Sequence, residues 1–329
     1  MAKKKTEEMV QTTGGEAVEM INKVIAIDCG KSNMKTIYGN NAYIFANKID
    51  EGYGDSLNSV TWNVEYKGKK YYVGDGASGS DLGEGKGSIQ HKIQALTTVC
   101  YHLDPTEKND NIVLIYGESL DYYFDETHRD EIIDSLTGKH TMKINEEEYN
   151  FEIKKVHILP EGYGHIISNI NSYLKGRCYV VDFGGRTINF LTVNNGAPVK
   201  EFSFSNEMGV YDLVGKCTSA LKLEGFRRSD EEVESYIRYG TTEEIQSIID
   251  RVALQHFKTY DDVLRKRKID IHSLLKSEKV VFIGGGAVAF ASVIKKHYGE
   301  NVVIPSEPII ANVKGFYQYG ARKFGRMEF

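Results

Sequence analysis

Two short glycine-containing segments hold the residue types that bind phosphates and divalent cations. Each begins with an aspartate directly after an apolar run, as Asp28-Cys29-Gly30-Lys31-Ser32-Asn33 and as Asp182-Phe183-Gly184-Gly185-Arg186-Thr187. Glycine lets the backbone N–H groups of a tight turn approach an anion closely, and a carboxylate can hold a hydrated divalent cation. Two such turns in one chain predict phosphates bound from two sides.

A third glycine turn follows another apolar run. Residues 280–283 lead into Gly284-Gly285-Gly286-Ala287 and then into a segment with helical character. A base and ribose can lie directly on such backbone. Many strand-to-helix turns are rich in glycine for packing alone, so this turn is informative only beside the other two.

Strands and helices alternate around these turns. We expect strands at 24–27, 36–38, 70–73, 112–116, 155–159, 178–182, 188–193 and 280–283, and helices at 161–174 and 208–223. Ser229 with Glu232, and Thr241 with Glu244, have capping-box spacing. An amphipathic helix continues from Ile245 and ends at the basic run 265–268. The alternation predicts an α/β protein.

The basic run and the loop 74–87 each allow two interpretations. The run fits favourable charge at a helix C-terminus, and otherwise a filament or partner contact. Residues 74–87 include six glycines. They lack the P-loop pattern, because Lys86 is followed by Gly87 and not by Ser or Thr. We interpret them as a flexible surface loop, with a contact or gating loop as the alternative.

Composition excludes several classes of protein. The chain has 329 residues, 41% of them hydrophobic, and a net charge of −5, which gives no general attraction to nucleic acid or anionic lipid. Its four cysteines form no CxxC pair, which argues against zinc and against a disulfide framework. Residues 1–22 lack the apolar region of a signal peptide, and no run approaches the ~18 apolar residues of a membrane helix. We expect a cytoplasmic protein with a disordered polar tail at 1–22.

In order and spacing, the three turns resemble those of the actin-like ATPase superfamily, which includes actin, the heat-shock chaperone ATPases and the sugar kinases. The first two turns correspond to its phosphate loops, and 284–287 to its adenosine turn. Segments starting at Pro160-Glu161-Gly162-Tyr163-Gly164 and at Ala311-Asn312-Val313 resemble its two connecting helices. The resemblance runs from about residue 24 to the C-terminus.

Within that superfamily the chain looks most similar to the ParM-like plasmid-segregating actins of bacteria and their archaeal relatives. It is too short for a chaperone's peptide-binding domain. Glu161, after Pro160, stands where ParM-like proteins have a glutamate in place of actin's catalytic glutamine. Residues 312–317 resemble the asparagine-and-glycine helix that closes those proteins.

The resemblance implies the following roles in ATP or GTP hydrolysis. Asp28 and Asp182 would hold Mg²⁺, mainly through water, and Glu161 would orient the attacking water or accept its proton. An isolated aspartate in such a place is often only a turn cap. The nucleotide would be bound by Gly30, Lys31, Ser32, Asn33, Gly184, Gly185, Arg186, Thr187, Gly284, Gly285, Gly286, Ala287, Lys216 and Asn312.

Three further residues have open roles. Glu118 follows the apolar run 112–116 and lies near the expected cleft, and Glu207 is placed to meet the ribose or base. Many relatives have a small residue at the position of Arg186. Its guanidinium either acts as a built-in arginine finger or pairs with a carboxylate of the neighbouring domain.

The implied fold is a two-domain actin-like, ribonuclease H-like fold with a nucleotide cleft between the domains. Domain I would comprise 23–165 plus 309–329, and domain II 166–308. The implied function is a nucleotide-driven, head-to-tail filament that segregates plasmid DNA through a DNA-binding adaptor, without direct contact to nucleic acid or membrane. A small-molecule phosphotransferase of the same superfamily and a cell-shape or cell-division actin homologue are the alternatives.

Overall fold

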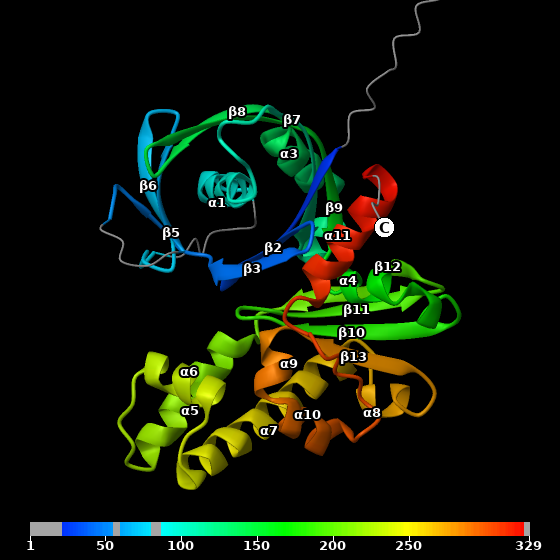
Figure 1. Ribbon diagram of the computed structural model, residues 1–329. Helices are drawn as coiled ribbons and strands as arrows, with labels where there is room; N and C mark the ends of the chain where they lie inside the picture. The colour runs from blue at the N-terminus through cyan, green and yellow to red at the C-terminus, as the bar shows by residue number, and fades with distance from the viewer. Residues whose placement is uncertain (1–21, 55–59, 80–86, 326–329) are drawn as a thin grey trace, which may run out of the picture.

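Two β-sheets form the framework of the computed structural model, which describes residues 22–54, 60–79 and 87–325. The larger sheet has the strand order β3-β2-β1-β7-β9-β8-β5-β6-β4, and the smaller has the order β12-β11-β10-β13. Figure 1 shows the larger sheet curling around helix α1, with the smaller sheet in the other half of the molecule.

The strands and helices have the following bounds. In the larger sheet they are β1 (Lys23–Cys29), β2 (Asn33–Tyr38), β3 (Asn41–Ala46), β4 (Ile49–Glu51), β5 (Thr61–Tyr66), β6 (Lys69–Gly74), β7 (Asn109–Glu118), β8 (Gly138–Ile144) and β9 (Glu147–Pro160). In the smaller sheet they are β10 (Arg177–Phe183), β11 (Ile188–Asn194), β12 (Ala197–Asn206) and β13 (Lys279–Ile283). The α-helices are α1 (Ile89–Cys100), α2 (Leu120–Tyr123), α3 (Glu126–Leu136), α4 (Tyr163–Ser168), α5 (Val210–Leu223), α6 (Asp230–Tyr239), α7 (Glu243–Lys266), α8 (Ile271–Leu274), α9 (Gly285–Ala289), α10 (Ala291–Tyr298) and α11 (Ala311–Phe324).

Parallel pairing brings the functional turns to one edge of each sheet. In the larger sheet β1, β7 and β9 run parallel, with Asp28 beside Gly117 and Gly117 beside Leu159. In the smaller sheet β10 and β13 run parallel, with Asp182 beside Ile283. The carboxyl ends of parallel strands are where α/β folds bind ligands.

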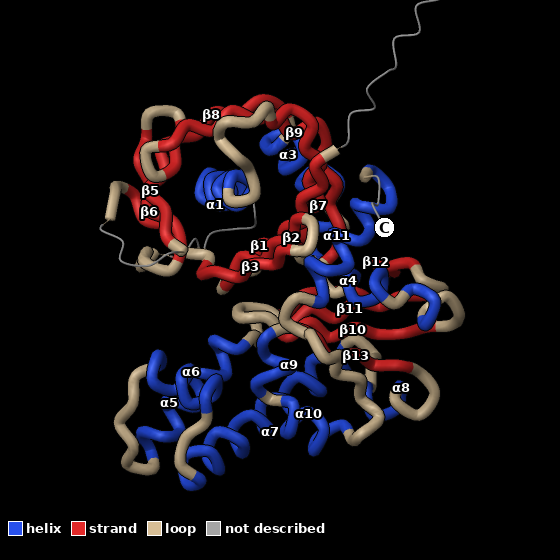
Figure 2. The backbone as a smooth tube through the Cα atoms, in the orientation of Figure 1, coloured by secondary structure: helices blue, strands red, loops and turns tan. Residues whose placement is uncertain are grey.

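Each half has its own buried core. Inside the larger sheet, α1 packs its apolar face, including Ile93, Leu96 and Val99, against strand residues. Below the smaller sheet in Figure 2, α5, α7 and α10 form a second core through residues such as Leu213 and Phe257. These cores make both sheets rigid supports for the turns at their edges.

Helices α4 and α11 cross between the two sheets. They touch backbone to backbone, since a Cβ on Gly315 would lie 1.9 Å from the carbonyl oxygen of Gly164. Only glycine permits this approach. The two segments expected to be connecting helices therefore do pack against each other.

Two local expectations are wrong. The helix expected at 161–174 is only α4, followed by a 3-10 turn at Ile170–Ser172. The Asn169 side chain bonds the carbonyl of His165 at this break, competing with the helix. Thr241 is not a cap, because α7 begins after Thr242, whose side chain makes no cap bond. The box at Ser229 and Glu232 is confirmed.

The other strand and helix expectations are confirmed. All eight expected strands lie within β1, β2, β6, β7, β9, β10, β11 and β13, the 208–223 segment contains α5, and the basic run closes α7. Strands β3, β4, β5, β8 and β12 were not predicted from the sequence. The expected tail at 1–22 falls, apart from Asn22, outside the described residues, as do 80–86 of the glycine-rich loop.

Candidate functional site

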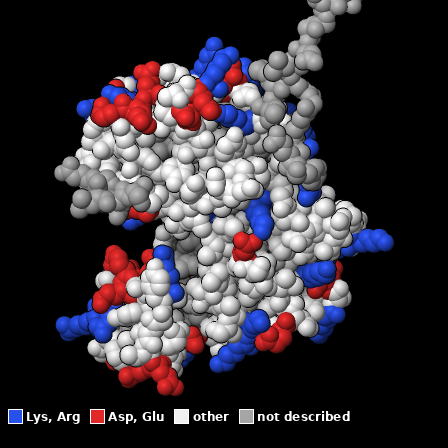
Figure 3. Space-filling view, viewed as in Figure 1, with Lys and Arg blue, Asp and Glu red and all other residues white. Residues whose placement is uncertain are grey.

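A cavity of about 800 Å³ lies between the carboxyl ends of the two sheets. Figure 3 shows the surface hollowed between the two halves of the molecule. All three glycine turns line the cavity, and so do Glu118, Glu161 and Glu207. Turns that are far apart in the sequence thus meet around one space.

The first two turns face each other at very close range. A Cβ on Gly185 would lie 1.7 Å from Ser32 Oγ, so the second turn needs glycine at this point. Ser32 Oγ is buried and has no hydrogen-bond partner within the described ranges. A buried hydroxyl without a protein partner, aimed between two glycine turns, suits an anionic oxygen of a ligand.

The third turn packs directly against the second. Gly284 has φ +88°, and a Cβ there would lie 2.6 Å from Asp182 Oδ1. Its N–H donates to the carbonyl of Pro308. The turn expected to hold the adenosine is therefore fixed beside the carboxylate expected to hold the cation.

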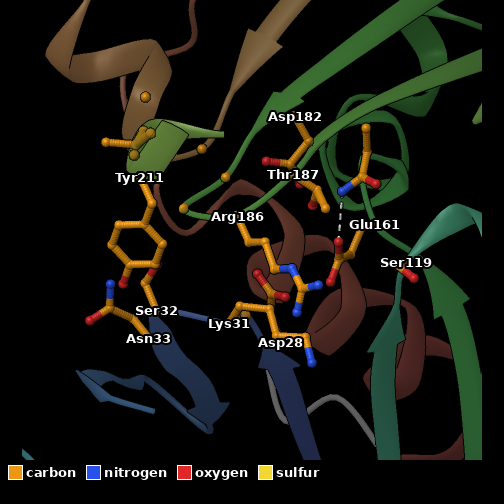
Figure 4. Close-up of a pocket in the computed structure, with 18 of the residues that line it drawn as sticks. Asp28, Lys31, Ser32, Asn33, Ser119, Glu161, Asp182, Arg186, Thr187 and Tyr211 are labelled. Carbon is orange, nitrogen blue, oxygen red and sulfur yellow. Dashed lines mark hydrogen bonds between the residues drawn. The ribbon is translucent and has the colours of Figure 1, made fainter. Parts of the chain in front are cut away.

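Four buried carboxyl groups face the cavity: Asp28, Glu118, Glu161 and Asp182. Asn312 Nδ2 donates to Asp182 Oδ2 at 2.7 Å. Asn189 Nδ2 donates to Glu161 Oε2 at 2.7 Å, and this bond is the dashed line in Figure 4. These bonds fix the direction of both carboxylates. Asn312, which was expected to bind the nucleotide, is not among the residues that line the cavity, and its role remains a prediction.

A half-buried lysine that was not predicted from the sequence compensates this negative charge. Lys35 on β2 forms an ion pair with Asp28, with Nζ 2.9 Å from Oδ2. Burial by itself would lower the pKa of Lys35, but Asp28, with Asp182 and Glu161 beyond it, raises that pKa above its ordinary value. Lys35 is therefore a fixed positive charge among the carboxylates.

Asp182 lies in a site that disfavours the charged form of its carboxyl group. Burial raises its pKa to about 7, and the neighbouring Glu161 and Asp28 add to the rise. Ionisation of Asp182 therefore costs free energy in this site, and a bound cation would offset that cost. Paired oxygen donors of this kind fit Mg²⁺, which prefers carboxylate and water ligands.

The raised pKa of Asp182 makes the stability of the ligand-free protein depend on pH. A carboxyl group whose pKa is raised on folding contributes stability at low pH, and that contribution is lost as pH rises from about 4 to about 7. We expect Asp182→Asn to raise the Tm by about 5 °C at pH 8, with the gain shrinking toward pH 4. Asp121→Asn, which changes an exposed carboxyl on the cavity rim, is the control. Equal Tm values for Asp182→Asn and wild type at every pH would contradict this assignment.

Arg186 lines the cavity and reaches toward Asp28 in Figure 4. Its Nη2 lies 2.7 Å from Oε1 of Glu207, which follows β12 of the same sheet. This ion pair does not link the two halves of the molecule, so it is not the partner in the neighbouring domain that the sequence suggested.

Besides Asn312, two predicted nucleotide-binding residues lie outside the lining. Ala287 is buried in α9, and Lys216 on α5 pairs with Asp212 at 2.6 Å. Their roles remain predictions. On the same side of the cavity, the lining includes Tyr211, Ile237 and Val288, an apolar wall that the sequence did not reveal.

Glu118, one of the four buried carboxyl groups of the cavity, has a histidine neighbour. Glu118 accepts a bond from its neighbour Ser119 N–H at 2.8 Å and lies 3.7 Å from His128 Nε2. Its contact with Glu118 raises the pKa of His128. Glu118, the last residue of β7, lines the cavity, as expected from its position after the apolar run 112–116.

Comparison with known proteins agrees with this geometry. A family model described as the N-terminal domain of actin-like proteins matches residues 26–164. Among curated proteins, no sequence matches the chain at a significant level.

Solved structures match along almost the whole chain. The ADP complex of Ta0583, an archaeal actin homologue, has a TM-score of 0.72 at 20% identity, covering 92% of this chain and 100% of its own. The Alp12 filament structure has a TM-score of 0.70 at 22% identity, covering 93% of this chain and 100% of its own. A 15-stranded ParM filament from Clostridium botulinum has a TM-score of 0.69 at 19% identity, covering 92% of this chain and 100% of its own.

The chain therefore has the actin-like fold, with a cavity where its two halves meet. The predicted resemblance to actin-like proteins agrees with the family model over residues 26–164 and with the fold, and ParM and Alp proteins are among the solved structures that share this fold. In the described residues, no helix is both long enough and apolar enough to cross a bilayer.

Proposed function

We propose that this protein hydrolyses ATP or GTP and couples hydrolysis to the growth and decay of a head-to-tail filament. The observation that carries the proposal is the meeting of three glycine turns and three expected catalytic or metal-holding carboxyl groups around one cavity. The similarity to ParM and Alp filament proteins supports self-assembly. A heterologous contact that does not close extends into a filament.

Different residues of the cavity bind the phosphates, the nucleoside and the cation. The first two turns, with Ser32, Asn33 and Lys31, hold the phosphates, and the 284–287 turn holds the adenosine or guanosine. Asp28 and Asp182 hold Mg²⁺, mainly through water. When bound, Mg²⁺ would neutralise the negative charge of the phosphates.

Glu161 performs the proton chemistry. Its carboxylate is buried, is held by Asn189, and faces the cavity at the edge of the larger sheet. It orients the attacking water and accepts its proton. Positioning of this kind supplies most of the catalysis in phosphoryl transfer.

The domain division and the partners are part of the same proposal. Residues 23–165 with 309–329, and 166–308, would move relative to each other about α4 and α11 as the nucleotide changes. The filament would carry plasmid DNA through a DNA-binding adaptor in the cytoplasm.

Right-angle light scattering with parallel phosphate release tests the proposal. On adding ATP–Mg²⁺ or GTP–Mg²⁺, scattering should rise above a threshold protein concentration, and phosphate release and decay should follow. Turnover without polymer over a wide concentration range would instead favour a small-molecule phosphotransferase.

Arg186→Ala separates the two roles of this residue. If the guanidinium contacts the phosphates, the variant should hydrolyse nucleotide at least about tenfold more slowly in single-turnover assays. Glu207→Gln, which removes the ion-pair partner and keeps Arg186, serves as the comparison. A normal rate in a folded Arg186→Ala protein would show that Arg186 is only an ion-pair residue.

A further inference from the structure

A second group of polar side chains converges outside the cavity, among α7, α8 and α10. It comprises Asp261, His272 and His297, one from each helix, and none of them lines the cavity. One ligand atom from each residue lies within 4.8 Å of the others. Figure 1 shows these helices in the half of the molecule that contains the smaller sheet.

Hydrogen bonding accounts for only part of this arrangement. Both imidazole Nε2 atoms face the same oxygen, Asp261 Oδ2, at 2.6 Å from His297 and 3.7 Å from His272. The shorter distance is a hydrogen bond, whereas the longer one exceeds hydrogen-bond range. Two imidazoles and one carboxylate around a common point are a donor set used by divalent transition metals.

A hydrogen bond on the side away from the histidines fixes the orientation of the Asp261 carboxylate. Tyr298 donates its phenolic proton to Asp261 Oδ1 at 2.9 Å, which leaves Oδ2 facing the two histidines. Hydrogen bonds of this kind hold metal-ligating carboxylates in place.

Access and neighbouring space also fit a ligand. Asp261 is 4% exposed, whereas the His272 side chain is 41% exposed. A cation can therefore enter past His272, and solvent can supply a fourth ligand there. Three protein ligands and one water are a common zinc arrangement.

We propose that Asp261, His272 and His297 form a site for a divalent transition metal ion of the zinc class, with water as the fourth ligand. Binding replaces the hydrogen bond between His297 and Asp261. The His297 proton moves to Nδ1 or to solvent, and the two ligand atoms separate to the spacing set by metal bonds of about 2.0–2.2 Å. The cysteine spacing argued against zinc, but this site contains no cysteine.

Such an ion would connect three helices that pack together beneath the smaller sheet. Because α10 follows closely on the third glycine turn and α9, the ion would also fasten that region to the end of α7. Nitrogen ligands favour zinc, cobalt and nickel over magnesium. The site is therefore distinct in chemistry from the one proposed for the nucleotide cation.

Metal-dependent stability of the tag-free, full-length protein tests the site. After treatment with EDTA and its removal, without nucleotide, Zn²⁺ at about 100 times its Kd should raise the Tm by about 5 °C. Mg²⁺ at the same concentration should not. In parallel, Co²⁺ should give the intense visible absorption of a tetrahedral site.

Histidine variants locate the effect. His272→Ala and His297→Ala should lose most of the Tm rise and the cobalt absorption, whereas the control His157→Ala on β9 should keep both. His272 is partly exposed, so its variant is expected to fold even if His297→Ala does not. No effect of zinc on the wild type, or an equal effect in His272→Ala, would overturn the site and leave only a hydrogen-bonded network.

Discussion

Replacing Glu161 by glutamine is expected to lower the rate of nucleotide hydrolysis at least about 100-fold, because a general base contributes about 10²–10⁴ to such rates. Glutamine has nearly the same shape and can still accept the bond from Asn189 Nδ2, now at 2.7 Å from Glu161. It cannot accept a proton. Nucleotide binding and filament growth should therefore persist, while filament decay slows.

Phosphate release and light scattering on the same samples measure both effects. Glu234→Gln, on the rim of the cavity, is the matched control and should hydrolyse at the wild-type rate. Glu161→Ala removes the hydrogen-bond acceptor as well. If Glu161→Gln keeps more than about a tenth of the rate and Glu161→Ala does not, Glu161 orients the water and is not its base.

The parts of this site that are local in sequence could be predicted. Each phosphate-type turn lies within a few residues of its strand, so an apolar run, an aspartate and glycine identify it without knowledge of the fold. The same holds for Glu161, which directly follows β9. That these turns meet around one cavity could be predicted only from the resemblance, because no local sequence pattern indicates how two sheets face each other.

Lys35 and Asn189 show a signal that could have been used. Each lies on the strand after its turn and pairs directly with the aspartate before it, Asp28 with Lys35 and Asp182 with Asn189. Both are seven residues beyond the aspartate. Continuing each hairpin past its turn would have predicted both residues, since paired residues share a face of the sheet.

Other misses had no local signal. Strands β5 and β8 pair with each other although they are far apart in the chain. Asp261, His272 and His297 follow no motif spacing and meet only through helix packing.

Replacing Lys35 by methionine is expected to cost about 3–5 kcal/mol of folding free energy at pH 8, because it removes the ammonium group that forms an ion pair with the buried Asp28 carboxylate. The same change deprives Asp182 of a neighbour that lowers its pKa. Chemical denaturation of the ligand-free protein measures the loss. Lys48→Met, which alters an exposed lysine nearby, should stay within about 0.5 kcal/mol of wild type.

Two further measurements connect the lost stability to charge and exclude lost packing. The deficit of Lys35→Met should shrink toward pH 4, because protonation of the carboxyl groups removes the uncompensated charge. The double variant Lys35→Met with Asp28→Asn should recover much of the loss, since both members of the buried pair are then neutral. A deficit that is independent of pH and unchanged in the double variant would mean that Lys35 acts through packing. Recovery of stability in the double variant would instead show that Lys35 compensates the charge of the buried carboxyl groups. Such compensation lets the carboxylates needed for the cation stay ionised when no cation is bound.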